Sequence, residues 1–155
     1  MPLNIDFQQI FLHFTSVDSL LGINKIEQER KIQHYCDEYS RLWSEHKSEE
    51  VTALMKQAVC EFPGDFDLLV KYLNCLTNAN LNANRLLEVR NEAQSIYDLI
   101  QEQCTTDSIR IWAKKIMCRY LSRLSVIDSS GVDITFAEKV LSGMPLMQNS
   151  RDIEA

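Results

Sequence analysis

The chain has 155 residues, which is enough for one compact domain with a small appendage, and only 4 of them are Gly and 3 are Pro. All-β folds and phosphate-binding loops need more turn-forming residues than this, so the composition favours a mainly helical protein. The 16 basic and 22 acidic side chains give a net charge of -6, so nucleic-acid binding would need a local patch of positive charge.

The cysteines and the N-terminus indicate where the protein resides. Its 5 cysteines are odd in number and form no C-x-x-C pair, which is typical of reduced thiols. The sequence also lacks a run of about 20 apolar residues that could span a bilayer, and its N-terminus does not have the pattern of a secretory signal. We therefore expect a cytoplasmic protein that has no contact with a membrane and holds neither a metal ion nor a cofactor.

Apolar residues recur at helical spacing along most of the chain. Pro63 and Gly64 are expected to end one helix, Asp65 to cap the next, and the asparagines between Asn74 and Asn84 to form a long polar loop. The spacing predicts six helices that pair into three consecutive hairpins, over residues 32–43, 51–62, 66–76, 89–100, 109–124 and 136–141.

A hairpin buries only one of its faces, so successive hairpins are expected to stack and cover the other. With a period of about 34 residues, the first unit resembles a tetratricopeptide repeat. Its signature positions fall at Tyr35, Tyr39, Leu42, Val51, Met55 and Ala58. Tyr39 departs from the family pattern because it stands where a small residue normally allows close helix packing. The fold class that we expect is therefore an all-α solenoid of about three tetratricopeptide-like hairpins.

The N-terminal residues have a sequence pattern that differs from that of the predicted hairpins. The segment FLHFTSVDSLLGI, residues 11–23, resembles the end of the helix-turn-helix domain in Cro/repressor-like regulators of the xenobiotic response element (XRE) family. In that family a helical-repeat domain often follows, and its last units resemble residues 120–124 and 137–141 here. The resemblance implies that residues 1–24 are the remnant of a helix-turn-helix bundle and that residues 25–155 are a tetratricopeptide-like domain.

This resemblance implies a function in transcription regulation. The chain would be a protein- or peptide-binding and self-association domain of a bacterial-type regulator, and DNA would be bound only through a helix-turn-helix domain that the chain lacks. The alternative is a stand-alone scaffold protein that is unrelated to transcription. The sequence contains none of the common catalytic motifs of hydrolases, metalloproteases or nucleotide-binding enzymes, so we do not expect an enzyme.

One helix carries a basic stripe with an aromatic residue. Trp112, Lys115, Arg119 and Arg123 are spaced i, i+3, i+7 and i+11, and Trp43 occupies the matching side of the first predicted helix. If the repeat frame is right, these residues are the candidates for lining a groove that binds an acidic peptide or a carboxylate. The simpler interpretation, which the pattern alone favours, is a solvated helix face on which the tryptophans serve packing.

A second candidate surface is apolar and lies near the N-terminus. Phe7, Ile10, Phe11 and Leu20 would belong to the helix-turn-helix bundle, and without the rest of that bundle they would be exposed. Large apolar patches seldom stay in water. We therefore expect the chain to form a homodimer through this segment or to fold the segment back onto the repeats.

Overall fold

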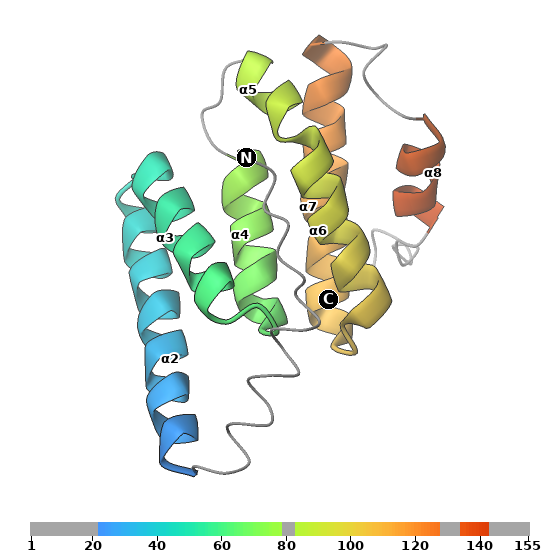
Figure 1. Cartoon of the computed structure of the whole chain (residues 1–155). Coiled ribbons are helices and arrows are strands. Elements are labelled where there is room, and N and C mark those ends of the chain that lie inside the picture. Colours follow the sequence, from blue (N-terminus) through green and yellow to red (C-terminus); the bar gives the residue numbers. More distant parts are fainter. Residues whose placement is uncertain (1–21, 79–82, 128–133, 143–155) are drawn as a thin grey trace, which may run out of the picture.

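The computed structural model describes residues 22–78, 83–127 and 134–142, and within these ranges the chain forms α-helices and no strand (Figure 1). This confirms the all-helical fold class. The helices are α2 (Gly22–Ser44), α3 (Ser48–Glu61), α4 (Phe66–Asn78), α5 (Ala83–Glu88), α6 (Arg90–Gln103), α7 (Asp107–Ile127) and α8 (Ile134–Ser142). None of these helices combines the length and the apolar character that crossing a membrane requires.

The helices pack in the order of the chain. The direction alternates from α2 to α3, α4, α6, α7 and α8, so that each of these helices runs antiparallel to the one before it (Figure 1). Contacts join α2 to α3, α3 to α4, α6 to α7 and α7 to α8, while α4 also contacts both α6 and α7. Helix α4 therefore lies at the centre, and its residues from Leu68 to Leu73 include buried positions on several sides.

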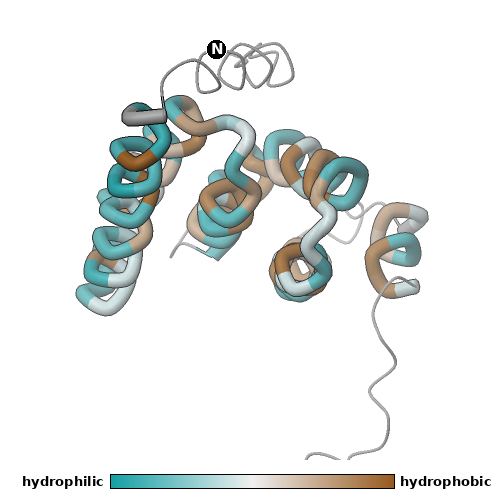
Figure 2. Tube along the Cα trace, turned by 90° about the horizontal axis from the view of Figure 1, so that it is seen from below, coloured by the Kyte–Doolittle hydropathy of each residue, from teal (hydrophilic) through white to brown (hydrophobic). Residues whose placement is uncertain are grey.

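A single cluster of buried apolar residues runs through the described helices, as is typical of one domain. Its largest fully buried members include Met55 on α3, Leu68 and Leu73 on α4, and Tyr120 on α7. Seen along the helix axes, apolar residues face neighbouring helices and hydrophilic residues lie mainly outside (Figure 2). The helical spacing of apolar residues thus sets the inward face of each helix.

Tyrosine hydroxyls join the helices across this core. Tyr35 on α2 donates a hydrogen bond to Glu61 on α3 over 2.7 Å, and Tyr72 on α4 donates one to Glu92 on α6 over 2.6 Å. The hydroxyl of Tyr120 on α7 donates to the backbone carbonyl of Leu86 on α5. Each tyrosine thereby buries an aromatic ring and still satisfies its polar atom.

The start of α4 agrees with the sequence. The Asp65 carboxylate accepts a hydrogen bond from the backbone N–H of Leu68 over 3.0 Å. An acidic side chain at this position satisfies an N–H group that has no partner within the helix. The prediction that Asp65 caps this helix is confirmed.

The end of α2 turns sharply at a residue with an uncommon backbone conformation. The backbone N–H of Lys47 donates to Leu42 O and that of His46 donates to Trp43 O, over 3.0 and 3.1 Å. These two bonds make a Schellman motif, whose left-handed position is usually occupied by glycine. Here it is His46, with φ of 58°. The turn directs the chain into α3 and holds the histidine side chain beside the end of α2.

The asparagine-rich segment differs from its prediction. Asn74 and Asn78 belong to α4 and Asn84 belongs to α5, so the expectation of a polar loop that begins at Asn74 was wrong. Asn74 is 6% exposed and its amide is hydrogen-bonded to two neighbouring helices. These tertiary contacts outweigh the low helix propensity of asparagine. Residues 79–82 lie outside the described residues.

Helices α2 and α8 each differ from the predicted pattern in one respect. Helix α2 begins at Gly22, so the expected boundary between residues 24 and 25 falls within this helix. On α8, Phe136 and Val140 are buried as the pattern predicts, but Leu141 is 61% exposed. A short helix that packs on one neighbour buries a narrow stripe, and Leu141 lies beside that stripe.

Candidate functional site

One face of the molecule collects aromatic, amide and cationic side chains from three helices, and we call it the α2–α4–α7 face. On each helix its members follow one another at intervals of three or four residues, or at sums of these intervals, and therefore lie on one side. They are Tyr39 and Trp43 on α2, Asp67, Lys71, Asn74 and Asn78 on α4, and Trp112, Lys115, Arg119 and Arg123 on α7.

Asn74 connects the three helices at the middle of this face. Its amide nitrogen donates to the Tyr39 hydroxyl on α2 over 2.9 Å, and its amide oxygen accepts from the Arg119 guanidinium on α7 over 2.7 Å. Both ends of a buried amide are thus satisfied. Burial raises the pKa of Tyr39 to about 12, so the hydroxyl stays protonated near neutral pH.

Lys71 has its charge balanced within the face. Its side chain is 14% exposed and forms an ion pair with Asp67, one turn earlier on α4. The ammonium also lies 5.9 Å from the centre of the Tyr39 ring and 5.8 Å from that of Trp112, within the range of cation–π attraction. Lys71 therefore joins α4 to aromatic side chains on both neighbouring helices.

A thiol lies beside this ion pair and is not activated by it. Cys36 Sγ donates to Asp67 Oδ2 over 3.7 Å, and burial, opposed by the positive charge of Lys71, raises the pKa of the thiol. A nucleophilic cysteine needs a lowered pKa. The chemistry of this cluster is therefore suited to packing and binding rather than to nucleophilic attack.

Two guanidinium groups mark the end of the face toward the C-termini of α4 and α7. Arg123 donates to the backbone carbonyl of Thr77 on α4 over 3.2 Å, one turn beyond the contact between Arg119 and Asn74. Partial burial and then the positive charge of Arg123 lower the pKa of Arg119. The two cations thus lie close enough to repel each other, although arginine remains charged at any physiological pH.

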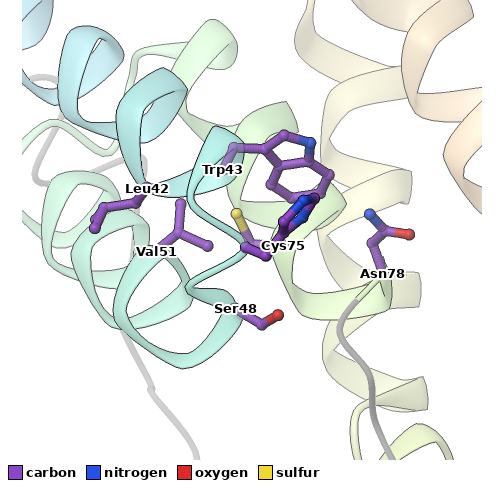
Figure 3. A pocket seen from close by; sticks show the side chains of 7 residues that line it. Leu42, Trp43, Ser48, Val51, Cys75 and Asn78 are labelled. Atoms are coloured by element: carbon purple, nitrogen blue, oxygen red, sulfur yellow. The ribbon is translucent and has the colours of Figure 1, made fainter.

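A hollow of about 280 Å³ opens beside the same end of the face (Figure 3). Its walls come from the end of α2, the start of α3 and the end of α4, and consist of Leu42, Trp43, His46, Ser48, Val51, Cys75 and Asn78. The Trp43 indole stacks on Tyr39, with ring centres 5.5 Å apart. The volume lies near the lower limit of small-molecule sites and would hold a single large side chain.

The structure brings most of the predicted groove residues onto one face. Trp43 and Trp112 are half-buried there and pack against the core, and Arg119 and Arg123 both contact α4. Lys115 and Arg119 are exposed. The N-terminal candidates for self-association lie outside the described residues, and they are Phe7, Ile10, Phe11 and Leu20.

Sequence reasoning missed the residues that organise this face. The prediction did not single out Lys71 or His46, it placed Tyr39 among the repeat signature positions, and it assigned Asn74 to a loop. One signal was present in the sequence: Lys71, Asn74 and Asn78 recur at helical spacing just beside the apolar stripe of α4. Here the polar stripe at the margin of a buried helix makes contacts between helices.

Among the described residues, no group of three or more histidine, cysteine or carboxylate side chains could hold a metal ion. No protein-family model matches the chain, and neither a curated protein nor a solved structure is significantly similar to it. The chemistry of the α2–α4–α7 face is therefore the basis for a functional proposal.

Proposed function

We propose that the chain is a protein- or peptide-binding and self-association domain of a transcriptional regulator, and that it binds an extended segment of its partner on the α2–α4–α7 face. In this proposal α2, α4 and α7 are the first helices of three tetratricopeptide-like hairpins. The observation that carries the proposal is the convergence of two half-buried tryptophans, two arginines and a hollow on this one face.

The residue types on this face support binding to another polypeptide. Tryptophan and arginine are enriched among the side chains that contribute most to protein–protein binding. The contacts of Asn74 and Lys71 hold Tyr39, Trp112 and Arg119 in place before any partner arrives. Side chains that are already ordered lose less conformational entropy on binding.

The regulatory role and the self-association come from the sequence. Residues 11–23 resemble the end of a helix-turn-helix domain, and Phe7, Ile10, Phe11 and Leu20 would supply an apolar surface for a homodimer. In such a regulator the partner segment binds the repeat domain, and DNA contacts belong to the helix-turn-helix domain. The net charge of -6 agrees with a chain that does not itself bind DNA.

Peptide binding is tested by selection from a displayed library of short random peptides on the full chain. The chain has 2 tryptophans, Trp43 and Trp112, and both lie on the α2–α4–α7 face. Selected peptides that lack tryptophan and tyrosine should therefore shift the tryptophan emission as they bind. In the Trp43→Phe variant, Trp112 becomes the single reporter and should still respond.

Two results would contradict this function. The first is a selection that enriches no peptide above a blank support. The second is a set of peptides that bind while both tryptophan signals stay unchanged, which would place binding elsewhere. Self-association is measured separately by sedimentation equilibrium, where a monomer at all concentrations would refute the homodimer.

The link to transcription has its own test. The genomic region immediately upstream of Met1 should encode a helix-turn-helix domain in the same reading frame. A chain whose native transcript begins at Met1 and whose partners are unrelated to promoters would instead be a stand-alone scaffold protein.

A further inference from the structure

The charge on the α2–α4–α7 face is opposite to that of the whole chain. Its members include the cations Lys71, Lys115, Arg119 and Arg123 and one carboxylate, Asp67, whereas the chain as a whole carries -6. A ligand that complements this face is therefore anionic.

The cations of the face differ in how their charge is balanced. Lys71 is paired with Asp67, but Arg119 bonds to the neutral amide oxygen of Asn74 and to no carboxylate among the described residues. A guanidinium carries several N–H donors in one plane, and Asn74 accepts from one of them. Arg119 is exposed and thus keeps donors available, while its neighbours partly desolvate its charge.

The neighbouring Arg123 places a second positive charge beside Arg119. The charge of Arg123 contributes to the lowered pKa of Arg119, so the two guanidinium groups repel each other. A carboxylate placed against both would offset the repulsion and would match the fork geometry of arginine.

We propose that the α2–α4–α7 face recognises an acidic peptide, whose carboxylate binds Arg119 and Arg123 and whose neighbouring amphipathic side chain enters the hollow between Trp43 and the polar side chains of Ser48 and Asn78. This inference rests on the proposed peptide-binding function and specifies its ligand. Asn78 in the wall of the hollow lies one helical turn, about 6 Å, beyond Asn74 along α4. The acidic residue of the peptide and the residue that enters the hollow are therefore expected within a few positions of each other.

The experiment uses the full chain and the peptides selected on it, with affinity measured by fluorescence anisotropy of labelled peptides. Selected peptides should be enriched in Asp or Glu. Exchange of their acidic residues for Asn or Gln should weaken binding roughly tenfold to a hundredfold, the usual effect of losing a charge-assisted hydrogen bond. Peptides with a free or an amidated C-terminus distinguish a terminal carboxylate from a side-chain carboxylate.

The protein variants provide the other half of a double-mutant cycle. The double variant with Arg119→Gln and Arg123→Gln should bind the acidic peptide more weakly by the same factor. Its affinity for the peptide with Asn or Gln at the acidic positions should equal that of the original chain. The matched control combines Arg30→Gln with Lys56→Gln, which removes two exposed cations from α2 and α3 and should have no effect on affinity. If the glutamine pair does not fold, Arg119→Lys keeps the charge, and the substitutions in the peptide still test the contact.

Three results would overturn this inference. If the enriched peptides carry no acidic residue and bind the double glutamine variant as tightly as the original chain, the peptide-binding function is kept and the proposed carboxylate site is rejected. If no peptide is enriched, both proposals are rejected. If instead an oligonucleotide at low salt binds through Arg119 and Arg123 while acidic peptides do not, the face recognises phosphate.

Discussion

Helix α4 meets α2 and α7 through contacts of different chemistry. On the α2 side, Asn74 donates a hydrogen bond to the neutral Tyr39 hydroxyl, and the neutral Trp43 indole lines the hollow. On the α7 side the contacts are made by the cations Arg119 and Arg123 to an amide and a carbonyl oxygen. The difference teaches that the contacts of Asn74 on the α2 side are neutral, whereas those on the α7 side place two cations on the face.

The largest expected effect comes from removing the residue that serves both sides. Asn74→Ala leaves the Tyr39 hydroxyl and the Arg119 guanidinium without their shared partner and creates a small cavity. We expect the free energy of unfolding to fall by about 3 kcal/mol. Urea unfolding measures it, with Asn91→Ala on the exposed part of α6 as the control. Equal stability of the two variants would show that Asn74 does not join the helices.

The next effect is a loss of stability at alkaline pH that depends on the α2 side. The pKa of Tyr39 is raised from 10.0 to about 12, so the unfolded chain loses this proton first as the pH rises. The stabilisation is complete below pH 10 and is lost between pH 10 and 12, by an amount on the order of 2 kcal/mol. Urea unfolding from pH 8 to pH 11.5 should show a shallower decline in Tyr39→Phe than in the original chain. Identical declines would contradict the raised pKa.

At neutral pH we expect smaller losses of stability, which differ between a variant on α2 and a variant on α7. Tyr39→Phe removes a hydrogen-bond acceptor from the buried Asn74 amide and should cost about 1 kcal/mol. Arg119→Gln also removes a hydrogen bond, but it relieves the repulsion by Arg123 and should cost about 0.5 kcal/mol. Thermal unfolding at low and high salt distinguishes them, because only the arginine variant changes a charge. If Arg119→Gln lowers the free energy of unfolding more than Tyr39→Phe does, the cations serve stability rather than binding.

The smallest effect concerns the turn beside the hollow. His46→Gly should stabilise the chain by about 0.5 kcal/mol, because a left-handed conformation costs a non-glycine residue roughly 1 kcal/mol and the entropy of glycine offsets part of the gain. The control is Lys47→Gly, one residue later, where φ is -88° and glycine should destabilise. Thermal unfolding measures both. Destabilisation of similar size in the two variants would mean that the His46 side chain contributes more than its backbone costs.

The sequence was sufficient for the helices and for parts of the face. Apolar spacing located the helical segments, and the acidic side chain before α4 identified its cap, because both signals depend on neighbours within the helix. The stripe of Trp112, Arg119 and Arg123 was found in the same way.

The remaining features of the face depend on contacts between segments far apart in the sequence. The pairing of Asn74 with residues 35 positions before it and 45 positions after it has no local signature. Asparagine has a low helix propensity, so local reasoning assigned it to a loop. The hollow was missed because its walls come from three different helices, and because one wall residue, His46, has a left-handed conformation that is usually found at glycine.

The amide that is shared among three helices has a mechanical consequence. If α7 tilted away from α4, the buried amide oxygen of Asn74 would lose its hydrogen bond. If α2 tilted away, the amide N–H of Asn74 would lose its hydrogen bond, and each loss would cost about 1–3 kcal/mol. Small strains applied to either flank are therefore resisted by all three helices together. The stiffness of this part of the molecule therefore depends on a buried amide at its centre, and Lys71 and Arg123 provide further links between the same helices.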